Sequence, residues 1–339
     1  MLAHLLPVGT DLVPGVTTPV PASLVQAPVV AHVVRSGFVE SVHRGCVVVT
    51  APDGSIEWEL GDGSAAVLPR SSNKPIQALA MVRSGLDLPD AGLAVACASH
   101  SGEPFHLEAV RRILAGAGLS EHDLQNTPDL PVDEVERTAW LAAGRPASSL
   151  AQNCSGKHAA MLATCVGNGW EQGGYRHPDH PLQQAVAVTI EDATGERIVA
   201  VAVDGCGAPI HAFPLVGLAR AFGRIASGAG GTAEARVAGA IRARPEHVGG
   251  TRRQVTTLIR EVPGLIAKDG AESVYAVGLA DGRGIALKVA DGHQRAKPVV
   301  LAAVLRRMGI GTPTALAHLE DAPVLGHGEP VGSIVAIGI

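Results

Sequence analysis

The sequence predicts an α/β protein in which both chain ends contribute strands to one antiparallel sheet, helices flank that sheet, and the middle part is mostly helical. Two observations lead to this fold class. Segments rich in β-branched or alternating apolar residues gather near the two ends, and apolar residues recur at helical spacing through the middle. A sheet with Val- and Ala-rich strands must bury both faces, so we expect helices on each side.

The strands that these patterns predict cover 29–35, 46–50, 55–60, 273–280, 284–290 and 333–339. Asp53-Gly54 and Asp281-Gly282 are turn dipeptides, and each separates two of these segments. We therefore expect one β-hairpin near each end of the chain. A cleft between the sheet and the helical part is the natural place for a ligand.

The helices that periodicity predicts cover 75–82, 105–114, 157–166, 181–190 and 214–222. Pro181 and Pro214 are typical of a first helical turn. His177 and His180 have a spacing seen in metal sites, but they bracket a helix entry, and a capping loop is the better interpretation. We divide the chain into a flexible, Pro-rich extension over 1–28 and one folded domain over 29–339. In that domain the strands fall mainly in 29–60 and 270–339, and the helical part covers about 71–195.

Composition excludes several classes of function. Hydrophobic residues make up 46% of the 339 residues, and charged residues make up 17%, as in a globular protein. The net charge of −5 and the absence of long basic runs argue against a nucleic-acid partner. No apolar stretch reaches the ~18 residues of a membrane-spanning helix. The first 28 residues hold no Lys or Arg, unlike a secretion signal. We expect a cytoplasmic protein.

Two polar clusters stand out against this apolar background, NCSGKH at 153–158 and DGCG at 204–207. Burying such side chains costs free energy, so the clusters point to a site. Cys154, Lys157 and His158 could share the start of one helix, and Cys206 could meet them from a second loop. Two thiolates and one neutral nitrogen suit zinc and leave a position open for water or substrate. The alternative is a pair of thiols without a metal.

A candidate nucleophile lies upstream, where Ser71 and Lys74 form an S-x-x-K spacing. The two side chains are one helical turn apart, and a lysine with a lowered pKa can take the proton of a serine. Pro75 places the pair at a loop-to-helix junction, where free backbone N–H groups suit an oxyanion. Alone, the spacing also fits a capping serine and a surface lysine.

Two further segments accompany this pair. The polar run ASHSGE at 98–103 follows an apolar segment and places Ser99 at its start. Such a run can deliver side chains into a cleft, or it can simply cap the helix that begins near Pro104. Lys268 and Gly270 precede a predicted strand and look like the K-x-G element of serine enzymes, with an exposed turn lysine as the alternative.

Taken together, these segments resemble the asparaginase II family typified by the rhizobial inducible asparaginases, whose fold is like the serine β-lactamases and glutaminases. The matching stretches are PRSSNKP at 69–75, QAL at 77–79, CASHS at 97–101, NCSGKH at 153–158, PDHP at 178–181, DGC at 204–206 and the KDG turn at 268–270. The resemblance runs from about Val34 to Gly292.

The resemblance implies a role for each matching residue, and makes 29–339 a catalytic domain. Ser71 would be the nucleophile and Lys74 its base, and Ser99 and Lys268 would form a second serine–lysine pair. The residues it assigns to substrate are Arg70, His158 and Asp204. Those it assigns to a zinc ion are Cys154, Lys157 and Cys206. The resemblance also implies a homodimer.

The implied activity is hydrolysis of the side-chain amide of L-asparagine to L-aspartate and ammonia through a serine acyl-enzyme. Glutaminase activity is an alternative, because one methylene changes binding by only ~1 to 3 kcal/mol. A β-lactamase-like acyl hydrolase is a second, although the chain lacks S-D-N and K-T-G. A zinc-binding or thiol redox module is a third, and it leaves both serine–lysine pairs unexplained.

Overall fold

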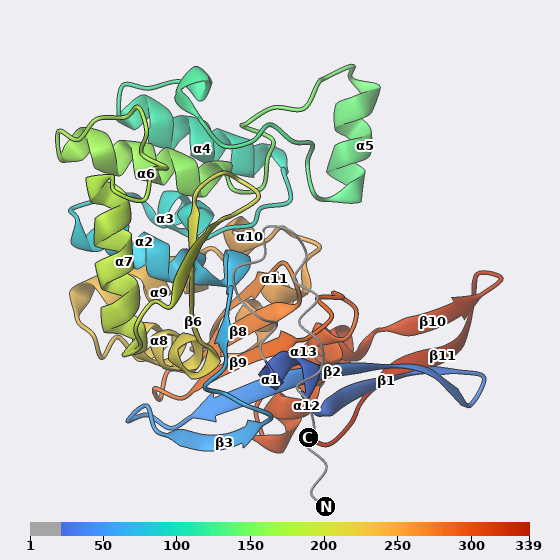
Figure 1. Cartoon of the computed structure of the whole chain (residues 1–339). Coiled ribbons are helices and arrows are strands. Elements are labelled where there is room, and N and C mark those ends of the chain that lie inside the picture. The colour runs from blue at the N-terminus through green and yellow to red at the C-terminus, as the bar shows by residue number, and fades with distance from the viewer. Residues whose placement is uncertain (1–21) are drawn as a thin grey trace, which may run out of the picture.

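The structure is a computed structural model that describes residues 22–339. Its main sheet has eight strands in the order β10-β11-β1-β2-β9-β8-β7, with β3 paired to β2 beside this path (Figure 1). Their bounds are β1 (Val29–Arg35), β2 (Phe38–Thr50), β3 (Ile56–Leu60), β7 (Ile266–Gly270), β8 (Val274–Gly278), β9 (Gly284–Val289), β10 (Pro323–Gly326) and β11 (Glu329–Ala336). All of these pairs are antiparallel, and both chain ends supply strands, so the predicted fold class is confirmed.

Helices dominate the middle of the chain and also pack on the sheet. Their bounds are α1 (Ala22–Val25), α2 (Lys74–Arg83), α3 (Asp90–Ala96), α4 (Pro104–Gly116), α5 (Glu134–Ala142), α6 (Ser155–Gly167), α7 (Pro181–Thr194), α8 (Leu215–Ser227), α9 (Thr232–Ala243), α10 (Pro245–Val248), α11 (Gln254–Glu261), α12 (Lys297–Arg307) and α13 (Pro313–Glu320). Both α8 and α12 contact β8 and β9, in which every residue is buried. Helices therefore cover both faces of the sheet centre.

A second, three-stranded sheet lies beside the helical part, in the order β4-β6-β5. It consists of β4 (Ala66–Val67), β5 (Ala200–Val203) and β6 (Pro209–Pro214). Periodicity did not predict this sheet, because its strands are short and mix Ala, Val and Pro. The turn between β5 and β6 carries Asp204 and Cys206, so this hairpin positions the second polar cluster.

Several predicted bounds need correction. The helical part continues to Glu261, whereas its predicted bound was about 195, because α8 to α11 belong to it. The segment 268–270 is the end of β7 and not a turn, since β8 supplies its hydrogen-bond partners. The last strand ends at Ala336 instead of 339. By contrast, His180 does cap α7, accepting a hydrogen bond from Leu182, as the capping interpretation predicted.

The Pro-rich extension falls mostly outside the described residues, which begin at 22. Its last part is fixed on the sheet, because Ala27 is 2% exposed and its carbonyl accepts a hydrogen bond from Arg44 at 2.8 Å. Between residues 22 and 339, the structure contains no helix with the length and apolarity that a membrane crossing requires.

Candidate active site

Ser71 lies in the 3₁₀ turn η1 (Arg70–Asn73), which leads directly into α2. Arg70 adopts a φ of 52°, a left-handed conformation that costs a non-glycine residue ~1 to 3 kcal/mol and that tends to occur at functional sites. The half-buried Ser71 side chain differs from its neighbour Ser72, whose hydroxyl is buried and donates to the carbonyl of Pro69 at 2.6 Å. Ser71 is thus the accessible serine of the pair.

Strand β7 passes directly against this turn. A Cβ on Gly270 would lie 2.7 Å from the carbonyl oxygen of Pro69 and 3.1 Å from the backbone nitrogen of Ser72. Glycine at the end of β7 is therefore required by the close approach of two backbones. This approach brings the strand that carries Lys268 beside Ser71.

Lys74 joins the S-x-x-K turn to the two other polar segments. Its buried Nζ donates to the carbonyl of Ala98 at 2.5 Å, to Ser99 Oγ at 3.1 Å and to Cys154 Sγ at 3.2 Å. Among the described residues, the hydrogen bonds of Lys74 include Ser99 and not Ser71. The S-x-x-K spacing places Ser71 and Lys74 at the same turn, but the serine that Lys74 contacts in this structure is Ser99.

The polar run at 98–103 is held by the loop that follows α10. Ser99 and Ser101 donate from their backbone nitrogens to the carbonyls of Val248 and Gly249, at 3.2 and 2.8 Å. The Glu103 carboxylate accepts hydrogen bonds from the backbone and hydroxyl of Thr251 at 2.8 and 2.7 Å. Glu103, not a serine, occupies the N-cap position of α4, and its side chain makes no cap bond. The run therefore places Ser99 in the site.

The two thiols of the polar clusters meet at the start of α6. Cys154 is the N-cap residue of α6, Cys206 lies in the β5–β6 turn, and both pack with Ala208 at 4% and 1% exposure. Both are free cysteines. A hydrogen bond between the thiols lowers the pKa of Cys206 and raises that of Cys154, and burial adds to the rise at Cys154. Of the two thiols, Cys206 therefore loses its proton more readily.

Lys157 projects from the first turn of α6 toward this thiolate, and its Nζ lies 3.2 Å from Cys206 Sγ. Burial lowers the pKa of Lys157, but the negative charges of Cys206, Cys154 and Asp204 outweigh it, so the pKa lies above its ordinary value. The close approach of α6 to α3 depends on Gly156, where a Cβ would lie 2.3 Å from the carbonyl oxygen of Val95. The predicted trio Cys154, Lys157 and Cys206 is thus together.

Arg70 and Asp204 form an ion pair beside the thiols, with Arg70 Nε 2.8 Å from Asp204 Oδ1. Burial raises the pKa of Asp204, but the positive charges of Lys157 and Arg70 lower it by more. The pKa therefore lies below its ordinary value, and the carboxylate is ionised. The pair joins two residues 134 positions apart in the chain. A cation and an anion at one place match the carboxylate and ammonium of a free amino acid.

Lys268 is fully buried on β7 and donates to its neighbour Asp269, to Oδ1 at 2.8 Å. Burial lowers the pKa of Lys268 to about 8, with Asp269 opposing this effect and the Lys74 charge adding to it. The described contacts pair Ser99 with Lys74, and Lys268 with Asp269, rather than Ser99 with Lys268.

His158 is fully buried on α6. Its Nδ1 is 2.7 Å from the hydroxyl of Tyr175, and its buried Nε2 has no partner among residues 22–339. Burial lowers the pKa of His158 well below its ordinary range, so the ring is neutral. It follows Lys157 on α6, and its described side-chain hydrogen bond goes to Tyr175.

Ser71 and Ser99 open into the same cavity of about 630 Å³, together with Asn153. Arg253 and Lys297 also line it, and sequence analysis had not singled them out. No local motif marks them, because Arg253 precedes α11 and Lys297 begins α12, and these helices meet at the cavity only in the folded chain.

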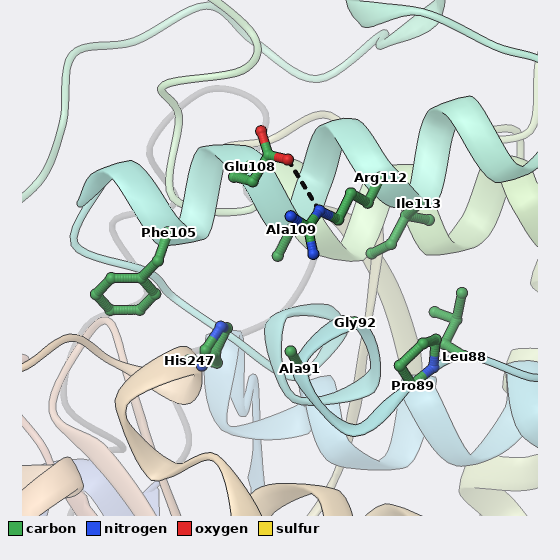
Figure 2. Close-up of a pocket in the computed structure, with 10 residues that line it drawn as sticks. All are labelled: Leu88, Pro89, Ala91, Gly92, Phe105, Glu108, Ala109, Arg112, Ile113 and His247. Atoms are coloured by element: carbon green, nitrogen blue, oxygen red, sulfur yellow. Dashed lines mark hydrogen bonds and ion pairs between the residues drawn. The ribbon is translucent and has the colours of Figure 1, made fainter.

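A second cavity, of about 330 Å³, lies between α3 and α4 (Figure 2). Its walls are mainly apolar, with Phe105 and Ile113 from α4, and its charged groups Glu108 and Arg112 pair with each other at 2.8 Å. None of the predicted site residues lines it. The serine cavity is the candidate active site.

A family model for L-asparaginase II matches residues 31–336. The chain belongs to the L-asparaginase II family. The resemblance inferred from the sequence motifs is thereby confirmed, and all predicted site residues fall within the matched region. Membership identifies an amide-hydrolysing family that acts on small molecules.

Comparison with curated proteins gives no match. Solved structures that are similar include a crystal structure of Mglu, at 15% identity and a TM-score of 0.43, covering 84% of this chain and 69% of that one. A β-lactamase from Mycobacterium bovis is 16% identical with a TM-score of 0.35, covering 78% of this chain and 94% of that one.

Proposed function

We propose that this member of the L-asparaginase II family is an L-asparaginase that works through a serine acyl-enzyme. The observation that carries the proposal is that Ser71 and Ser99 share one cavity, while the buried Lys74 Nζ lies 3.1 Å from Ser99 Oγ. A serine nucleophile needs a base within reach and an accessible carbonyl site, and this arrangement supports both requirements.

The Arg70–Asp204 pair is proposed to hold the amino-acid end of the substrate. Arg70 binds the α-carboxylate and Asp204 the α-ammonium, while the side-chain amide extends toward Ser71, the next residue along the chain. The ion pair is partly buried, which strengthens its interaction with a charged ligand. Anchoring one end fixes the amide carbonyl against the nucleophile.

In the proposed reaction, Ser71 Oγ attacks the amide carbonyl carbon and its proton passes to Lys74. The 3.1 Å contact between Lys74 and Ser99 supports Ser99 as a relay for this proton. Ammonia leaves with a proton from the same network, and backbone N–H groups at the helix start hold the oxyanion. Lys268, with a pKa of about 8, exchanges protons with this network near neutral pH. Water then hydrolyses the ester.

We also propose that Cys154, Lys157 and Cys206 hold a zinc ion. The two contacting thiols and the amine at 3.2 Å form a donor set that suits zinc. Among residues 22–339, no group of three His, Cys, Asp or Glu side chains gathers at one point, so lysine has to complete the set. It must lose its proton to do so. Bound zinc would supply a positive charge that orients substrate.

Ammonia release from L-asparagine and from L-glutamine, measured with Ser71→Ala as the control, tests the proposal. Asparagine turnover that is lost in a folded Ser71→Ala protein supports it. Turnover that survives the substitution contradicts the assigned nucleophile, and preference for glutamine makes the enzyme a glutaminase. We further propose that the protein is cytoplasmic and forms a homodimer. Light scattering of the purified protein tests the dimer, and cell fractionation tests the location.

A further inference from the structure

The serine cavity is larger than asparagine requires. The group that leaves from asparagine is ammonia, comparable in size to a water molecule, whose share of liquid volume is ~30 Å³. The cavity measures about 630 Å³. Arg70 and Asp204, which are proposed to hold the amino-acid end, are not among its described lining residues. Ser71 thus stands between the substrate's anchored end and a chamber with room for a substituent on the amide nitrogen.

One wall of this chamber has an excess of positive charge. Asp269 accepts contacts from three cationic side chains, Lys268 at 2.8 Å, Arg253 at 2.9 Å and Lys297 at 3.5 Å. These cations hold the pKa of Asp269 well below its ordinary range, although burial opposes them. The single negative charge of Asp269 cannot neutralise three positive charges. A ligand carboxylate at this wall would be stabilised by the remaining charge.

The same wall presents a hydrogen-bond donor without a partner. Tyr275 is 2% exposed, and its hydroxyl makes no hydrogen bond within the described part of the chain. The Lys297 ammonium lies 5.9 Å from the centre of its ring, and both side chains line the chamber. An unpaired buried hydroxyl costs free energy, which a ligand oxygen would recover. A neutral donor beside an ammonium is suited to a carboxylate.

We propose that the chamber binds the amine half of β-aspartyl dipeptides, and that the enzyme hydrolyses them. This inference rests on the proposed function, because the acyl half is the same as in asparagine. Ser71 Oγ forms an ester with the β-carbonyl as the C–N bond breaks, and the amino acid leaves with a proton from the serine–lysine network. Water cleaves the ester, releasing aspartate and returning the proton to Ser71. Tyr275 and Lys297 hold the carboxylate of the departing amino acid.

A matched pair of substrates tests the charge recognition. β-Aspartylglycine carries the carboxylate, and β-aspartylglycinamide is its neutral isostere. We expect kcat/KM for the dipeptide to exceed that for the glycinamide about tenfold or more, since a charge-assisted hydrogen bond contributes ~1.5 to 3 kcal/mol. Equal rates, or no cleavage of the dipeptide by protein that hydrolyses L-asparagine, would overturn this inference and leave the proposed function standing. Failure to hydrolyse L-asparagine would overturn both.

Variants place the recognition at the chamber wall. Tyr275→Phe deletes only the unpaired hydroxyl, and it should lower the ratio of dipeptide to asparagine kcat/KM about three- to tenfold, through KM. Lys297→Gln should lower this ratio more than tenfold. Arg306→Gln, which removes a surface cation paired with Glu320, controls for net charge and should leave the ratio unchanged. If Tyr275→Phe, with wild-type thermal stability, leaves the ratio unchanged, the chamber is not the subsite and the inference fails.

Discussion

The contact between β7 and the turn that carries Ser71 makes Gly270→Ala a sharp test of the site geometry. The new Cβ would lie 2.7 Å from the Pro69 carbonyl oxygen, and ordinary van der Waals contact begins at 3.4 Å, so the backbones must separate by about 0.7 Å. The two atoms that lie closer than 3.4 Å to this Cβ both belong to the backbone, so no flexible side chain can move away instead.

Such a displacement should affect catalysis more than folding. Overpacking of this kind typically costs ~1 to 3 kcal/mol of stability. A misplacement approaching 1 Å near reacting groups can lower kcat by ~10²-fold. We therefore expect kcat for L-asparagine to fall about ten- to a hundredfold in a protein that still folds.

The assay combines kcat from ammonia release with urea unfolding. Gly239→Ala is the matched control, because its Cβ would meet nothing within 4 Å in α9. It should keep full activity and gain ~0.5 to 1 kcal/mol of stability. If Gly270→Ala retains the kcat and stability of the wild type, β7 does not press on the Ser71 turn and the geometry argued above is wrong.

Three further predictions test other parts of the site. The kcat/KM of L-asparagine should rise with pH through an apparent pKa of about 8, because burial makes Lys268 release its proton there, and a flat profile from pH 6 to 10 would contradict its role. Glu103→Gln should lower the free energy of unfolding in urea by ~1 to 3 kcal/mol, because the hydrogen bonds from Thr251 lose a charged acceptor. An unchanged free energy would show that these hydrogen bonds do not stabilise the segment at 98–103. Cys206→Ser should lower the zinc content measured by native mass spectrometry from one ion per chain toward none, whereas equal metal in both proteins would exclude this thiol as a ligand.

Local sequence patterns predicted much of the fold. Strand β1 has the predicted bounds, because its β-branched residues fit a half-buried strand wherever it pairs. Helix α7 starts at Pro181 as predicted, since a proline at this position needs no backbone donor. Strand β7 was mistaken for a turn because Asp269-Gly270 has turn composition, and only pairing with β8 overrides it.

The site was predictable in its residues and less so in its contacts. Ser71 and Lys74 are recognisable from their spacing when it is considered together with the other polar segments. That Lys74 contacts Ser99 and Cys154 depends on three segments meeting in space, which no local pattern encodes. Lys297 was missed for the same reason, because it belongs to α12 and reaches the cavity only by packing on the sheet.

The most direct test of the central claim is to trap the acyl-enzyme. Protein mixed with L-asparagine is quenched in acid within milliseconds, digested and analysed by mass spectrometry. The account predicts a β-aspartyl ester on the peptide that contains Ser71, and no such adduct in Ser71→Ala. An adduct on another residue, or undiminished turnover by Ser71→Ala, would contradict it.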